Sequence, residues 1–168
     1  MKHTLSVLVE NKPGALTRVT SMFARRGYNI ESLAVGPTER PDVSRIVLRV
    51  DCSQHSLEQI EKQMHKLVNV LRVKELPPDE SVERELALIT ISAPPAQRAE
   101  LMALTEVFNA RVADVGPETL VFEIVGEPEE LDSFEELLRP HGIREMARTG
   151  RIGLRRASSR RPQLQRAN

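Results

Sequence analysis

The fold is constrained most by a succession of hydrophobic periodicities that occurs twice along the chain. In each half, an alternating stretch typical of a strand is followed by a helical stripe, by two strands joined in a hairpin, by a second helical stripe and by a last strand. The order βαββαβ folds into an antiparallel sheet with both helices on one face. The sequence therefore predicts an α+β protein built from two tandem ferredoxin-like sandwiches.

The first copy is predicted to span residues 1–76. Leu16, Val19 and Phe23 recur at helical spacing, which predicts a helix over about residues 15–26 that ends at Gly27. The other elements are expected as strands at 5–9, 29–35, 45–50 and 71–73, and as a helix after Ser56 whose apolar face carries Leu57, Ile60, Met64, Leu67 and Val68.

The second copy is predicted at residues 84–154, after a linker at 77–83 that is rich in proline and acid. Residues 155–168 are basic and polar without periodicity, so a disordered tail is predicted there. The elements of the second copy are expected as strands at 86–92 and 143–148, a hairpin at 112–125, a helix at 96–109 carrying Leu101, Leu104 and Phe108, and a helix from Pro128 carrying Leu131, Phe134 and Leu138.

One face of each predicted sheet has no helix to cover it. Such a face is either solvated or packed against a partner. Val47 falls on this outer face of the first sheet, where an apolar side chain favours a partner. A homodimer is therefore expected.

The charges are distributed unevenly, although the formal net charge is zero. Residues 1–76 carry 12 Lys and Arg against 8 Asp and Glu, residues 77–153 carry 7 against 16, and residues 154–168 carry 5 Arg and no acid. The predicted folded part is therefore acidic on balance and would repel a phosphate backbone. We expect no nucleic-acid partner.

Nothing in the sequence suggests a membrane or secreted protein. No apolar run approaches the roughly 20 residues of a membrane span, and the N-terminal segment lacks the apolar core of a signal peptide. Cys52 is the single cysteine, which excludes an internal disulfide framework. These features predict a cytoplasmic protein without membrane contact.

The sequence carries no recognisable catalytic or metal-binding motif. The sequence contains no glycine-rich phosphate loop, no HExxH and no paired CxxC, and its four histidines are scattered. Cys52 could be a nucleophile if a histidine lay beside it in the fold, but no motif surrounds it. The acidic run at 127–136 is typical of the first turn and solvated face of a helix. We therefore predict neither a catalytic residue nor a metal site.

The segment at 10–16, ENKPGAL, joins the first strand to the first helix and is the one candidate binding site. Pro13 fixes the turn, and Gly14 lets a ligand approach the backbone closely. The amides of Gly14, Ala15 and Leu16 would lie at a helix N-terminus, where free N–H groups and the helix dipole favour a carboxylate.

Other groups near this turn fit the rest of a small amino acid. Asn11 could accept a hydrogen bond from an ammonium group, and Leu16 and Ile30 could contact an apolar side chain. The alternative is that Asn-Lys-Pro-Gly is only a good strand-to-helix turn, in which Asn and Gly serve backbone geometry. Both interpretations stay open on the loop alone.

Several stretches together resemble one family. LSVLVENKPGALTRVTSMFARRGYNIESLAVGPTE and LEQIEKQMHKLVNVLRV are similar to the N-terminal ACT domain of the small regulatory subunits of acetolactate synthase, also called acetohydroxyacid synthase. VERELALI and ARTGRIGL are similar to landmarks of that family's second, ACT-like domain. NxPGxL marks ACT domains in general, and its combination with RGYNIESL at this spacing is specific to this family. The resemblance covers about residues 2–155.

The resemblance implies a homodimer that binds valine, or a related branched-chain amino acid, where two ACT domains meet. Asn11, Gly14, Ala15 and Leu16 would correspond to the family's binding loop, and Asn29 and Ile30 to the contribution of the partner protomer. Such a subunit has no catalytic activity alone; it stimulates a catalytic large subunit in branched-chain amino-acid biosynthesis and confers feedback inhibition. Thiamine diphosphate, magnesium and FAD would belong to that large subunit, with no cofactor in this chain.

A different class of function is a free-standing ACT-domain sensor that regulates transcription or another enzyme. The sequence shows no helix–turn–helix pattern, and the predicted folded part is acidic, which argues against a DNA-binding regulator. An enzyme in its own right is a third class, which turnover of pyruvate by the isolated chain would establish.

Overall fold

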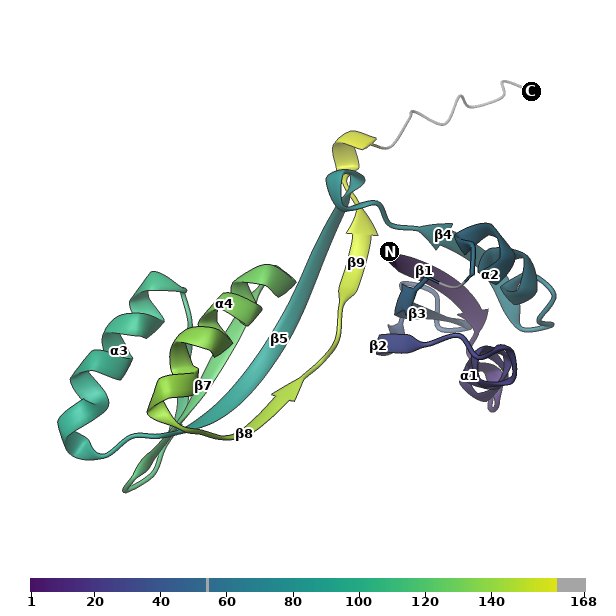
Figure 1. Cartoon of the computed structure of the whole chain (residues 1–168). Coiled ribbons are helices and arrows are strands. Elements are labelled where there is room, and N and C mark those ends of the chain that lie inside the picture. The colour runs from purple at the N-terminus through teal and green to yellow at the C-terminus, as the bar shows by residue number, and fades with distance from the viewer. Residues whose placement is uncertain (54, 160–168) are drawn as a thin grey trace. The chain divides into compact units, whose positions relative to one another are not determined.

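A computed structural model of the chain, described here for residues 1–53 and 55–159, contains two compact units (Figure 1). Of the described residues, those of 1–83 and 152–159 form the N-terminal unit, and Arg84–Arg151 form the C-terminal unit. Each unit has one antiparallel sheet with its helices on one side. The predicted α+β class and the repeated βαββαβ order are both confirmed.

The N-terminal unit has the strand order β2-β3-β1-β4, so β1 and β3 are central and β2 and β4 are edges. All three pairings are antiparallel. As an edge strand, β2 presents a row of unpaired backbone groups. The elements of this unit are β1 (Lys2–Glu10), α1 (Ala15–Arg26), β2 (Ile30–Pro37), β3 (Val43–Asp51), α2 (Leu57–Met64) and β4 (Val70–Glu75).

The core of this unit lies between the sheet and its two helices. The alternating apolar residues of β1, Leu5, Val7 and Val9, are buried there. Val19 and Phe23 of α1 are buried with them. Leu16 was expected on the same stripe, but it is 38% exposed, and Ala15 is buried instead. The helical stripe therefore begins one residue earlier than the spacing suggested, which leaves a leucine exposed at the start of α1.

Two further expectations for this unit were wrong. Helix α2 ends at Met64, so Val68 lies beyond it and is 83% exposed. Val47 was expected to expose an apolar side chain on the outer face of the sheet, yet it is only 3% exposed in the single chain. It is therefore no argument for a partner, and the apolar residues that stay exposed lie elsewhere.

The C-terminal unit repeats the arrangement with the strand order β6-β7-β5-β8. Leu101, Leu131, Phe134 and Leu138 are buried as their helical spacing predicted. Helix α3 begins at Arg98, two residues later than expected, after a short 3-10 turn. The elements are β5 (Ser81–Ser92), α3 (Arg98–Val107), β6 (Arg111–Val115), β7 (Thr119–Gly126), α4 (Pro128–Leu138) and β8 (Ile143–Arg148), with 3-10 turns η2 (Pro95–Gln97) and η3 (Arg139–His141).

The segment expected as a linker at 77–83 is ordered. It forms a 3-10 turn, η1 (Pro78–Glu80), and β5 already begins at Ser81. A short strand that the sequence did not predict, β9 (Ile152–Arg155), pairs with β5, and the guanidinium of Arg155 lies 3.0 Å from the carboxylate of Glu80. The strand is only four residues long, and its apolar residues Ile152 and Leu154 are 58% and 52% exposed, so no buried apolar face marks it in the sequence.

The predicted disordered tail at 155–168 begins inside β9, and a further 3-10 turn, η4, covers Ala157–Ser159. The rest of that prediction, at 160–168, lies outside the described residues. Within residues 1–53 and 55–159, no helix is both long enough and apolar enough to span a bilayer.

Candidate functional site

The candidate loop lies where β1 ends and α1 begins. Gly14 is the N-cap of α1 and has a φ of 83°, in the left-handed region that favours glycine. As a glycine, this N-cap has no side chain with which to cap the helix, and the first turn of α1 contains no acidic residue. The positive end of the α1 dipole is therefore not compensated by a carboxylate from α1 itself.

The hydrogen bonds of the loop show which amides are available. Ala15 N–H donates to the carbonyl of Lys12 at 3.2 Å, which closes the turn. Among the described residues, no acceptor is found for the amides of Gly14, Leu16 and Thr17. Gly14 and Leu16 thus keep the donors expected of them, and the amide of Ala15 is already engaged. Thr17 was missed, although the rule that the first amides of a helix lack partners could have included it.

Asn11 is fixed by the turn between β2 and β3. Its backbone N–H donates to the carbonyl of Asp42 at 2.8 Å, and its side-chain Nδ2 donates to the carbonyl of Pro41 at 3.0 Å. The side-chain bond uses Nδ2 as its donor, which leaves the side-chain oxygen Oδ1 as an acceptor. The exposed Asn11 side chain can therefore offer an oxygen to an ammonium group.

The charged groups near the loop are mutually compensated. The ammonium of Lys12 lies 3.2 Å from Oε1 of Glu10, so Lys12 is not a free cation. Hydrogen bonds from Asn69 and then from Lys12 lower the pKa of Glu10 below its usual value, which keeps this carboxyl ionised. A carboxylate ligand at this loop would rely on backbone amides rather than on a lysine.

Asn29 and Ile30 lie far from the loop within one chain. Asn29 accepts a hydrogen bond from Asp51, at the end of β3, whereas Asn11 bonds to Asp42, just before the start of β3. Those two ends are about 26 Å apart, given the 9 residues of β3 and a rise of about 3.3 Å per residue. One chain therefore does not bring the two halves of the predicted site together.

Other candidate sites carry less chemistry. Burial raises the pKa of the Cys52 thiol, which disfavours the thiolate that a nucleophile requires. In the described part of the chain, no group of three or more His, Cys, Asp or Glu side chains could hold a metal ion. Neither observation points to catalysis.

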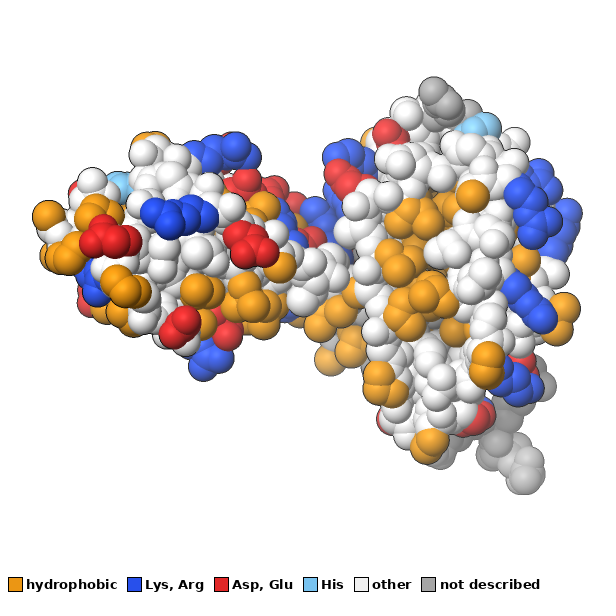
Figure 2. Space-filling model, turned by 90° about the horizontal axis from the view of Figure 1, so that it is seen from below, with side chains coloured by type: hydrophobic (Ala, Val, Ile, Leu, Met, Phe, Trp, Pro, Cys, Tyr) orange, Lys and Arg blue, Asp and Glu red, His pale blue; other side chains and the backbone are white. Residues whose placement is uncertain are grey.

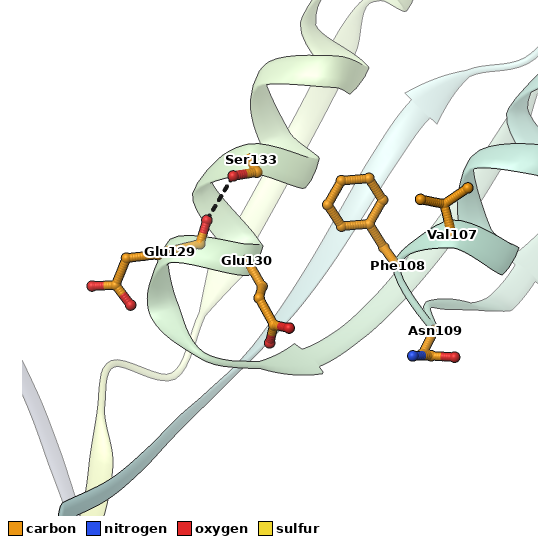
Figure 3. Close-up of a pocket in the computed structure, with 6 residues that line it drawn as sticks. All are labelled: Val107, Phe108, Asn109, Glu129, Glu130 and Ser133. Carbon is orange, nitrogen blue, oxygen red and sulfur yellow. Dashed lines mark hydrogen bonds between the residues drawn. The ribbon is translucent and has the colours of Figure 1, made fainter. Parts of the chain in front are cut away.

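A shallow pocket of about 360 Å³ lies in the C-terminal unit between the end of α3 and the first turns of α4 (Figure 3). Two of its polar side chains serve α4 itself: Glu130 accepts from the amide of Glu127 at 2.7 Å, and Ser133 donates to the carbonyl of Glu129 at 2.8 Å. These groups stabilise the helix start rather than a ligand. The pocket is lined by Val107, Phe108, Asn109, Glu129, Glu130 and Ser133.

Two family models match the sequence. One, described as AHAS small subunit-like ACT domain, matches residues 5–72, and the other, described as Small subunit of acetolactate synthase, matches residues 84–157. The two matches fall on the two copies of the βαββαβ order. The resemblance seen in the sequence is thereby confirmed in both halves of the chain.

Similar proteins span almost the whole chain. The acetolactate synthase small subunit of Mycolicibacterium smegmatis is 49% identical over 154 residues, which are 92% of this chain and 91% of that protein. A protein of Archaeoglobus fulgidus named Probable acetolactate synthase small subunit is 46% identical over 160 residues, 95% of this chain and 100% of that protein.

A solved structure shows the same fold. The crystal structure of the acetolactate synthase small subunit from Thermotoga maritima has a TM-score of 0.86 and 40% sequence identity to this chain. The similarity covers 93% of this chain and 98% of the Thermotoga maritima chain. The tandem ferredoxin-like arrangement is therefore shared over nearly the full length of both proteins.

Proposed function

Because this chain belongs to the family of acetolactate synthase small subunits, we propose that it stimulates a catalytic large subunit and makes it sensitive to valine or a related branched-chain amino acid. The chain acts in valine, leucine and isoleucine biosynthesis without being catalytic alone. Thiamine diphosphate, magnesium and FAD, which supply the chemistry of joining two 2-oxo acids, belong to the large subunit in this proposal.

The observation that carries the proposal is the set of polar groups at the start of α1. The free amides of Gly14, Leu16 and Thr17 suit a carboxylate, and Oδ1 of Asn11 suits an ammonium group. Leu16, exposed beside them, supplies an apolar contact. Together these groups match the three parts of a small hydrophobic amino acid.

A homodimer is supported by the exposed edge of the N-terminal unit. Strand β2 is the outermost strand of its sheet, and Val35 on β2 and Leu16 on α1 are 46% and 38% exposed. In Figure 2, where β2 and α1 lie toward the viewer, hydrophobic side chains gather along the middle of this unit. A second copy that pairs its own β2 edge here would cover these side chains.

Such a dimer also accounts for the separation of the two half-sites. If two β2 strands pair antiparallel about a two-fold axis, the start of one lies beside the end of the other. Asn29 and Ile30 precede or begin β2, and the turn that holds Asn11 follows β2. Each effector would therefore contact the loop of one protomer and residues 29–30 of its partner.

An effector shared between protomers can act as a regulator. A ligand that contacts both chains favours the dimer arrangement in which both halves of its site meet. The catalytic subunit responds only if it distinguishes that arrangement from another. Couplings of this kind are typically about 1 to 3 kcal/mol, or about 5- to 150-fold in affinity.

The proposal is tested by an acetolactate assay on a purified catalytic large subunit, with and without this chain, over a titration of L-valine. We expect this chain to increase acetolactate formation and valine to reverse the increase. Leucine and isoleucine titrations would rank the three effectors. Catalytic activity that ignores both this chain and valine would refute the proposal, and purification of the chain with DNA or an unrelated enzyme would favour the free-standing sensor.

A further inference from the structure

Asn69 lies immediately before β4 and is only 9% exposed, an unusual degree of burial for a polar side chain. It forms hydrogen bonds with residues on both sides of the candidate loop. Its carbonyl accepts from the amide of Glu10 at 2.9 Å, and its Nδ2 donates to Oε2 of Glu10 at 2.6 Å. Its Oδ1 accepts from the guanidinium of Arg18 at 2.7 Å.

Glu10 and Arg18 stand at the two ends of the loop. Glu10 is the last residue of β1, and Arg18 lies in the first turns of α1, where its own amide bonds to the carbonyl of Gly14 at 3.0 Å. Asn69 therefore ties the strand that enters the loop to the helix that leaves it. Both of its side-chain bonds involve a charged partner, which makes them stronger than bonds between neutral groups.

The sheet is irregular next to this clamp, which consists of Glu10, Asn69 and Arg18. The register between β1 and β4 shifts between Leu8 and Val9, directly before Glu10. A shift of this kind re-aims the following residues and is common beside functional sites. Glu10 thus faces Asn69 across a local irregularity rather than across a regular ladder.

We propose that Asn69 and Arg18 are positioning residues for the effector: they hold the amides at the start of α1 in the geometry that a carboxylate requires. The inference rests on the proposed function for the identity of the ligand. The left-handed Gly14 lies within the loop, and a glycine loses more backbone freedom on ordering than other residues. A clamp that orders the loop beforehand reduces the entropy lost on binding, and so raises affinity without contacting the ligand.

The test is Arg18→Met in the full chain, with Arg26→Met as the matched control. Arg26 lies on the same helix and donates to Oε1 of Gln63 at 2.8 Å, a bond of the same kind made away from the loop. We expect Arg18→Met to raise the calorimetric Kd for L-valine about three- to tenfold, which is the net contribution typical of one intramolecular hydrogen bond. Arg26→Met should bind valine as the wild type does.

Hydrogen exchange of the loop amides in the absence of valine separates positioning from a general loss of stability. Arg18→Met should speed exchange at the hydrogen-bonded loop amides of Asn11, Lys12 and Ala15, while core strands β1 and β3 keep their protection. In Arg18→Lys, both the slow loop exchange and the affinity for valine should be partly restored. Asn69→Asp provides a second route, because its carboxylate keeps the acceptor for Arg18 but repels Glu10. The two variants should weaken valine binding similarly.

The possible failures are distinguishable. If the wild type does not bind L-valine, the proposed effector is wrong, and exchange at the amides of Asn11, Lys12 and Ala15 still decides whether the clamp orders the loop. If the wild type binds and Arg18→Met matches Arg26→Met in both affinity and loop exchange, the clamp has no positioning role. Faster exchange throughout the N-terminal unit in Arg18→Met and Asn69→Asp would likewise overturn the proposal.

Discussion

Gly14 shows how one residue combines backbone and ligand requirements. Its φ of 83° makes a branched or bulky residue unfavourable, yet a Cβ built there would meet no atom within 4 Å. Substitution at this position is therefore limited by backbone strain and by what the new side chain does to a ligand, not by a clash. This separation makes Gly14 a suitable position for testing charge.

Gly14→Asp should abolish valine sensitivity while the chain still stimulates the catalytic subunit. The new carboxylate would lie beside the free amides and repel the carboxylate of the effector, and we expect the Kd for valine to rise at least about tenfold. Gly14→Asn is the matched control, because asparagine has the same size, carries no charge and tolerates the left-handed region. Full valine inhibition in Gly14→Asp, measured by acetolactate assay, would remove this loop from the effector site.

At the scale of elements, β2 and α1 together form the surface on which the proposed dimer depends. Val35 points to the same side of the sheet as the core residue Ile46, with which it is paired, but β2 is the last strand and leaves it partly uncovered. The apolar surface thus arises from the end of the sheet and not from its outer face, where Val47 is buried. This location determines which substitution should separate two copies.

Val35→Lys should weaken the dimer, because a lysine on an edge strand opposes pairing with another strand. We expect the monomer–dimer dissociation constant, measured by analytical ultracentrifugation, to rise at least about tenfold if a buried apolar contact becomes a buried charge. Val125→Lys, on β7 of the C-terminal unit, is the control, since Val125 is 54% exposed and lies on a different sheet. A dimer lost in Val125→Lys but kept in Val35→Lys would place the interface elsewhere.

At the scale of the whole molecule, the proposed site belongs to two chains at once. The loop at 10–17 and residues 29–30 lie at opposite ends of β3, so neither chain of a dimer would hold a complete site by itself. A dimer of identical chains would have two such sites, each combining one loop with the partner's β2 start. This arrangement has a consequence for mixed dimers.

Gly14→Asp and Asn29→His should each abolish valine binding alone, but mixing the two variants should restore part of it. In a mixed dimer, one site would combine both altered residues, and the other would combine two unaltered halves. After subunit exchange of equal amounts, about half of the dimers would be mixed if pairing is random, each with one intact site. Calorimetry on the mixture checks this, and no restored binding despite demonstrated exchange would show that each chain builds its own site.

The sequence by itself determined the order of elements, most of both cores and the position of the candidate loop. These features are local: a period of two or of 3.6 residues, and a Pro-Gly turn before a helix, are encoded by neighbours in the chain. Leu16 and Val68 mark the limit of that reasoning, because the end of a helix and the exact edge of its buried stripe depend on what packs against it.

Only the tertiary structure decided how the loop is held. Arg18 and Asn69 are 51 residues apart and Asn69 and Glu10 are 59 apart, yet their side chains form one clamp. Strand β9 likewise pairs with β5, although most of the C-terminal unit lies between the two strands in the sequence. No periodicity encodes such contacts, because they arise only when the folded chain brings distant residues within hydrogen-bonding distance.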